Sequence, residues 1–254
     1  MKIKYLFTIL LNLIIACAIA QSKEVTTDIR PTNFVNIKKI IPQIELDMRY
    51  YTAHNFVGRR IVGYKAPVCL LTLPAAMALK TVENKLLPFG MTLKVYDCYR
   101  PQMAVNDFAN WATQINNISM RKEFYPTVDK KNLFKDGYIL YRSGHTRGST
   151  MDLTIVPLNS KIPIYNPNVK QIACTAPQDQ RTPDNSLDFG TGYDCFSEAS
   201  HPDYQQLTSQ QKANRLLLQT LMKQAGFKGL DTEWWHFTLI NELYPDTYFN
   251  FPVN

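Results

Sequence analysis

The sequence predicts a single α+β domain in which a small, mainly antiparallel sheet is packed with helices. Three observations support this. The chain has 254 residues and is 45% hydrophobic, which is enough for a sizeable core. Segments with strand-like and helix-like patterns occur together along it. It contains no internal repeat, low-complexity tract or linker that would divide it.

The first 20 residues are typical of a signal peptide. They combine early lysines with an apolar segment over 6–15 and a small-x-small cleavage site that ends at Ala20. The apolar segment is short for a membrane anchor. Lipoprotein processing at Cys17 is an alternative that we favour less. We therefore expect an exported, periplasmic protein without stable membrane insertion after leader cleavage.

The cysteine count agrees with export. Four cysteines remain after the leader, an even number that is typical of an oxidising compartment. We expect the pairs Cys69–Cys98 and Cys174–Cys195, because each joins neighbours in sequence. The alternative is a structural zinc site made of all four thiolates. Their wide spacing, without a C-x-x-C pair, argues against it.

The first half of the chain contains two predicted strands and two predicted helices. Residues 21–36 are polar and mixed, so we expect a flexible segment ahead of a domain over 37–254. Alternating apolar residues over 44–48 predict a strand, and a second follows over 91–96. Helices are expected over 72–87 and 101–113. The apolar face of the first helix is assigned to Leu73, Met77, Val82 and Leu86.

The second half begins with a loop-rich segment over 124–140. A β-rich run over 151–156 follows, and then a surface excursion over 157–188 that holds five prolines. The clearest helix spans 208–225, where Thr208 or Ser209 can cap the start and Gly226 ends it. Its apolar positions are assigned to Leu216, Leu217, Leu218, Leu221 and Met222. A final strand is expected over 236–240.

The stretch from Ser143 to Asp152 carries the strongest chemical signal. It contains His145 and Asp152 seven residues apart, and Asp152 begins a predicted strand. A catalytic zinc site needs a third protein ligand, and His236 offers one, with the carboxylate of Glu233 three residues before it. Three ligands and a water make an open zinc site, and a carboxylate that does not bind the metal can take a proton from the water.

The joint pattern, S-x-H-x-x-G-x-x-x-D followed much later by E-W-W-H, resembles the LAS-type zinc peptidases. It is most similar to the VanX-type D-alanyl-D-alanine dipeptidases, and the resemblance covers 37–254. Further segments match this family in its order: Asn55–Gly58, Tyr99–Pro101, Gly190–Asp194, Asn214–Leu216 and Tyr248–Val253.

The resemblance implies hydrolysis of D-alanyl-D-alanine to two D-alanines, with one zinc ion per chain, in the turnover or recycling of cell-wall peptides. It implies that the metal ligands are His145, Asp152 and His236. It implies that Glu233 is the catalytic base and that Arg100 stabilises the oxyanion. The substrate would be bound by Ser143 at its carboxylate and by Tyr50 and Asp194 at its ammonium group.

Two alternatives remain open at this stage. A zinc D,D-carboxypeptidase of the same superfamily would trim D-Ala from peptidoglycan stems, and a non-catalytic module would bind zinc without turnover. The Asp194 loop argues against the first, and Glu233 with Arg100 argues against the second. The formal charge of +7 comes without a run of five Lys or Arg residues, so we expect a small dipeptide as partner and no nucleic acid.

Overall fold

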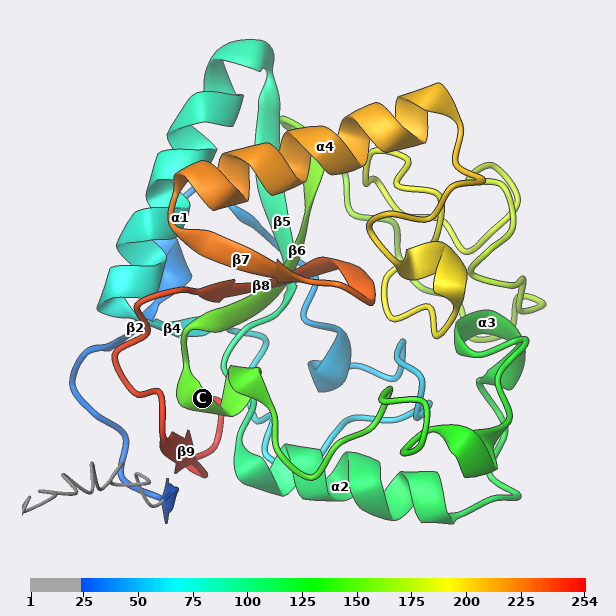
Figure 1. The fold of residues 1–254 in the computed structure, drawn as a ribbon, viewed down its shortest axis with the longest axis horizontal. Helices are drawn as coiled ribbons and strands as arrows, with labels where there is room; N and C mark the ends of the chain where they lie inside the picture. The colour runs from blue at the N-terminus through cyan, green and yellow to red at the C-terminus, as the bar shows by residue number, and fades with distance from the viewer. Residues whose placement is uncertain (1–23) are drawn as a thin grey trace, which may run out of the picture.

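The computed structural model describes residues 24–254 (Figure 1), so the predicted signal peptide and Cys17 lie outside the described residues. The strands are β1 (Val25–Thr27), β2 (Phe34–Asn36), β3 (Glu45–Leu46), β4 (Leu70–Thr72), β5 (Met91–Asp97), β6 (Thr150–Pro157), β7 (Phe227–Leu230), β8 (Glu233–Leu239) and β9 (Thr247–Phe249). The helices are α1 (Leu73–Leu86), α2 (Gln102–Thr113), α3 (Arg121–Phe124) and α4 (Ser209–Gln224).

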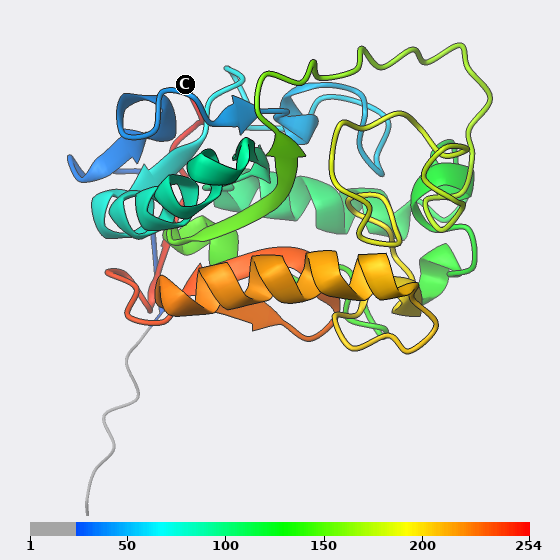
Figure 2. The same cartoon turned by 90° about the horizontal axis from the view of Figure 1, so that it is seen from above.

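The centre of the fold is a five-stranded sheet with the order β3-β5-β6-β8-β7. Only the pair β3/β5 is parallel, so the sheet is mainly antiparallel, as predicted. Helices α1 and α4 pack against the sheet and against each other (Figures 1 and 2). The α+β prediction is confirmed.

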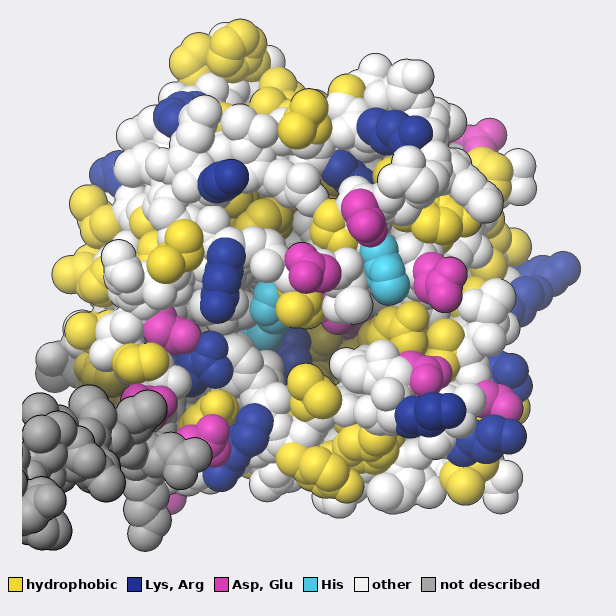
Figure 3. All heavy atoms as spheres, viewed as in Figure 1, with side chains coloured by type: hydrophobic (Ala, Val, Ile, Leu, Met, Phe, Trp, Pro, Cys, Tyr) yellow, Lys and Arg dark blue, Asp and Glu magenta, His cyan; other side chains and the backbone are white. Residues whose placement is uncertain are grey.

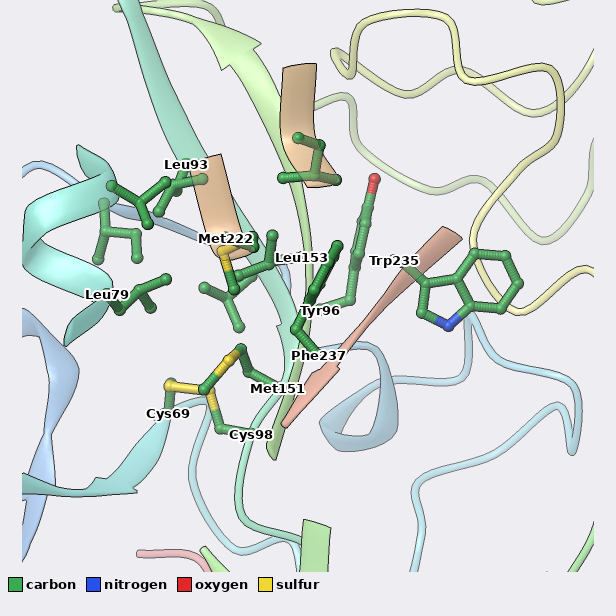
Figure 4. Packing of buried hydrophobic residues seen from close by; sticks show 14 of the residues in the cluster. Cys69, Leu79, Leu93, Tyr96, Cys98, Met151, Leu153, Met222, Trp235 and Phe237 are labelled. Atoms are coloured by element: carbon green, nitrogen blue, oxygen red, sulfur yellow. A yellow bond between two sulfur atoms is a disulfide. The ribbon is translucent and has the colours of Figure 1, made fainter. Parts of the chain in front are cut away.

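One large hydrophobic core lies between these two helices and the sheet. Figure 4 shows how it interlocks: Leu79 from α1 and Met222 from α4 meet Leu93, Leu153 and Phe237 from three strands. Because side chains alternate between the faces of a strand, the residues between these core positions point to the opposite face of the sheet. The candidate site lies on that opposite face.

The predicted helices are present, but part of the predicted apolar faces was wrong. Leu73 and Met77 of α1 are 41% and 48% exposed, and Leu216 of α4 is 64% exposed. The buried face of α1 uses small residues instead, Ala75 and Ala76. Alanine lets the helix approach the sheet closely, and a count of large apolar side chains overlooks it.

The segment 21–36 was expected to be flexible, yet its described part, residues 24–36, contains two strands. Strand β1 pairs with β9, near the C-terminus, and β2 pairs with β4. Phe34 accounts for the ordered structure of this segment, because its buried ring packs edge-on against Tyr99, Phe249 and Phe251. One large aromatic residue therefore anchors a segment whose overall composition is polar.

The region 157–188 forms no regular element after β6 ends, as predicted. It runs over the outside of the molecule next to α3 and the loop before α4 (Figure 2). Strand β7 and the start of β8 at Glu233 were not predicted. Within residues 24–254, no helix has both the length and the apolar composition of a membrane span.

Both predicted disulfides are present, with Cα–Cα distances of 5.3 Å for Cys69–Cys98 and 5.6 Å for Cys174–Cys195. Since the four thiols are paired, the four-thiolate zinc alternative is wrong. We expect the purified protein to have an intact mass that corresponds to two disulfides. Alkylation after non-reducing denaturation should modify none of these four cysteines, and modification of all four would contradict the oxidised state.

Candidate metal centre and active site

Three side chains predicted as metal ligands converge on one point. His145 Nε2 and His236 Nδ1 lie 3.3 Å and 3.2 Å from Asp152 Oδ1, and 3.3 Å from each other. Among residues 24–254, this is the group of His, Cys, Asp and Glu side chains whose geometry could hold a metal ion. The structure thus brings together predicted ligands that are 91 residues apart in the chain.

The sheet places two of the ligands. Asp152 of β6 and His236 of β8 are direct partners in the antiparallel register, so their side chains leave the same face of neighbouring strands. His145 comes from the short turn Gly144–Arg147, which ends at Gly148 with a φ of 83°. A Cβ at Gly148 would lie 2.2 Å from the Phe34 ring, so only glycine fits there.

The polar atoms fit a divalent metal. His145 Nδ1 lies 2.7 Å from the Cys98 carbonyl oxygen and donates to it, which leaves Nε2 free as a ligand. Asp152 Oδ1 is buried and has no hydrogen-bond partner. A buried carboxylate oxygen without a donor, faced by two imidazole nitrogens, is the donor set of a metal site.

Glu233 lies beside this centre, with Oε2 3.4 Å from His236 Nδ1. In a regular strand, residues three apart point to opposite faces. The β7/β8 pairing shifts register between Gly229 and Leu230, and Leu230 pairs with Glu233. This irregularity turns the Glu233 side chain to the metal side.

Arg100 is held rigidly next to Asp152. Its Nε donates to Asp97 at 2.9 Å, its Nη2 lies 3.6 Å from Asp152 Oδ2, and its guanidinium lies over the ring of Tyr50. Asp97 in turn accepts a 2.7 Å hydrogen bond from Tyr64. Arg100 was predicted from the sequence, but Asp97 and Tyr64 were not. These two residues act only by positioning Arg100, and no local sequence pattern marks such a residue.

Tyr50 and Asp194 form a buried pair. The Tyr50 hydroxyl donates to Asp194 Oδ2 at 2.8 Å, and no such contact involves the neighbouring Tyr51. Asp194 has a φ of 56°, a conformation that L-residues rarely adopt. Burial, together with the charges of Asp152 and Glu233, raises the pKa of Asp194 well above its usual range. A cation next to Asp194 would therefore be bound favourably.

Tyr193 links this pair to the metal ligands and was not predicted. Its hydroxyl donates to Asp152 Oδ2 at 3.1 Å and lies 3.4 Å from the Tyr50 hydroxyl. The segment Gly190–Asp194 was noted as a whole, but only its last residue was given a role. The two other histidines, His54 and His201, do not line this site, and His54 instead contacts Glu123.

All eight candidate residues line one cavity of about 200 Å³. Rings of Phe56, Phe108, Tyr138 and Phe196 form much of the remaining wall. This face of the molecule is hollowed near its centre, with histidine and acidic side chains beside the hollow and charges of both signs interspersed around it (Figure 3). A larger hollow of about 600 Å³ under the excursion contains none of the eight.

Comparison with known proteins agrees with this geometry. A family model described as D-ala-D-ala dipeptidase, of the M15 peptidases, matches residues 30–163 and 173–254.

The chain belongs to this dipeptidase family. Three curated relatives are named D-alanyl-D-alanine dipeptidase. The protein from Streptomyces coelicolor is 32% identical, and that from Enterococcus faecalis is 30% identical; each match covers 87% of this chain and 98% of the relative. The protein from Escherichia coli is 28% identical over 82% of this chain and 85% of the relative. Membership identifies the protein as a metallopeptidase, in agreement with the His/Asp centre.

Proposed function

We propose that the protein hydrolyses D-alanyl-D-alanine to two D-alanines. The observation that carries this proposal is the buried Tyr50–Asp194 pair, in the same small cavity as the His145/Asp152/His236 centre. Family membership and the names of the relatives support the substrate. Pockets for drug-sized ligands measure about 300–1,000 Å³, so a cavity of about 200 Å³ suits a smaller molecule.

We propose zinc as the metal, one ion per chain, held by His145, Asp152 and His236. Two imidazoles and one carboxylate are a usual donor set for catalytic zinc. When bound, zinc lowers the pKa of a coordinated water to about 7 and polarises a carbonyl oxygen.

Glu233 is the proposed general base. It lies at the edge of the centre, where its carboxylate can take a proton from the attacking water and give it to the leaving amine nitrogen. Arg100 is placed to stabilise the negative charge that develops on the carbonyl oxygen. Because Asp97 and the aromatic rings already fix its guanidinium, little reorganisation is needed during the reaction.

Polar groups on the cavity wall would give the substrate its direction. Asp194 and the Tyr50 hydroxyl receive the ammonium group of the dipeptide, and a charge-assisted hydrogen bond forms there. Ser143 lies on the cavity wall and is proposed to contact the substrate carboxylate. A zwitterionic dipeptide therefore meets a complementary group at each end.

We further propose that the mature protein begins after Ala20, is exported to the periplasm and acts in cell-wall peptide turnover. The two disulfides support an oxidising compartment. The dipeptidase domain then spans 37–254, with 24–36 attached to it by β1 and β2.

The experiment that tests the function compares D-Ala-D-Ala with N-acetyl-D-Ala-D-Ala and a D-Ala-D-Ala-ended pentapeptide, each with and without zinc. The blocked substrates place a neutral amide at Asp194, so this buried carboxyl group, whose pKa is raised, loses the cation that would stabilise its charged form. A cost of about 3 kcal/mol for that loss corresponds to about a hundredfold in kcat/KM in favour of the free dipeptide. Asp194→Ala should slow dipeptide hydrolysis and narrow this preference.

Equal rates on free and acetylated dipeptide would replace the dipeptidase proposal with the carboxypeptidase alternative. Stoichiometric zinc without turnover of any of the three substrates would favour a binding module.

A further inference from the structure

The loop that carries Asp194 is held at its ends by helix α4. Arg215 donates to the carbonyl oxygens of Phe189, Ala199 and His201, at the two ends of the segment 189–201. These contacts leave the middle of the loop, where Asp194 lies, to be fixed by other parts of the chain.

The excursion holds that middle through Cys174. The carbonyl oxygen of Cys174 accepts a 2.8 Å hydrogen bond from Gly192, and its side chain is bonded to Cys195. Cys174 therefore contacts the loop on both sides of Asp194, at Gly192 and at Cys195. The backbone N–H of Cys174 donates a 2.9 Å hydrogen bond to the carbonyl oxygen of Glu123, so Cys174 is itself fixed to α3.

A second anchor lies at the far end of the excursion. The carboxylate of Asp184 accepts hydrogen bonds from Arg49, Lys94 and Tyr96, at 2.9, 2.5 and 2.9 Å. Burial would raise the pKa of Asp184, but the two cations lower it to about 2, so the carboxylate stays charged.

Two of the three partners of Asp184, Tyr96 and Arg49, lead to the proposed ammonium-binding residues. The ring of Tyr96 stacks on that of Tyr193, with centroids 4.3 Å apart. Arg49 directly precedes Tyr50 and lies over the rings of Tyr96 and Tyr193. Between them, the two anchors reach Asp194 and Tyr50, which line the cavity, and Tyr193, whose hydroxyl lies 3.4 Å from that of Tyr50.

We propose that the excursion 157–188 is a positioning element for substrate selectivity: Cys174 and Asp184 hold Tyr193, Asp194 and Tyr50 where they distinguish a free ammonium group from an acylated nitrogen. This inference rests on the proposed function and identifies the part of the chain that determines its selectivity. The family model leaves residues 164–172 unmatched, between the two parts that it covers. Neither Cys174 nor Asp184 belongs to these nine residues. We therefore expect selectivity to depend on the two anchors and not on the residues 164–172.

The test measures selectivity as the ratio of kcat/KM for D-Ala-D-Ala to that for its N-acetyl form. In the double variant Cys174→Ala/Cys195→Ala, alanine suits the buried positions and leaves no hydroxyl unsatisfied. We expect the ratio to fall about tenfold or more, since a displacement of about 1 Å can cost about a hundredfold. Zinc content should stay at one ion per chain, because none of the three ligands is touched.

Two matched variants separate positioning from general destabilisation. Val82→Ala removes buried volume from α1, in the core away from the cavity, and should leave the ratio unchanged. Replacing 164–172 with a Gly-Ser linker of equal length keeps both anchors and should also leave it unchanged. A wild-type ratio in the double cysteine variant, or an equal fall in Val82→Ala, would overturn the inference.

If the double cysteine variant does not fold, Asp184→Asn carries the test, with the same expected fall and the same controls. Amide hydrogen exchange gives a readout that is independent of turnover: exchange over 190–196 should rise in either variant and stay unchanged in Val82→Ala. Wild-type protein that fails to prefer the free dipeptide contradicts the proposed function, whereas unchanged exchange contradicts only the anchoring.

Discussion

Replacement of His145, Asp152 or His236 by alanine is expected to remove the bound metal and abolish hydrolysis. The proposed site has three protein ligands, so the loss of one would leave two, and two protein ligands rarely hold a catalytic zinc. Among residues 24–254, the group of side chains that could hold a metal ion at this point consists of these three residues.

The measurement is zinc content by elemental analysis after dialysis, together with D-Ala-D-Ala hydrolysis. His201→Ala is the matched control, since His201 lies outside the cavity and should keep wild-type zinc and activity. Full zinc content in one of the three ligand variants would exclude that residue from the centre. Asp152→Asn adds a finer comparison, because it keeps the shape of the side chain and removes the charge that balances the cation.

Glu233→Gln is expected to keep the zinc and lose about 10²- to 10⁴-fold in kcat, the range for general acid–base catalysis. Glutamine has nearly the same shape as glutamate but cannot take the proton of the attacking water. The three ligands come from other positions, so the centre itself should remain intact.

The experiment measures metal content and kcat in the same preparation. Glu198→Gln is the control, because Glu198 is an exposed glutamate outside the catalytic cavity. Near-normal turnover in a zinc-loaded Glu233→Gln variant would remove Glu233 from the mechanism. A variant that loses its zinc would instead show that Glu233 helps to hold the metal.

The sequence by itself determined the parts of this protein that depend on local pattern. Apolar periodicity and capping residues located α4, and structure confirms Thr208 as its N-cap. The ordered motifs predicted the family and named eight residues that the fold places around one cavity. Proximity in sequence also predicted both cysteine pairs correctly. The catalytic roles of the eight residues remain predictions.

The tertiary structure decided what depends on contacts between distant segments. The ordered structure of residues 24–36 follows from the contacts of Phe34 with Tyr99 and with rings of the C-terminal segment. The turn of the Glu233 side chain toward the proposed metal site follows from a register shift with β7. Tyr193 and Asp184 gain importance only from their partners across the fold. Hydrogen bonds and packing between residues far apart leave no periodic trace in the chain, so only folding reveals which side chains support the site.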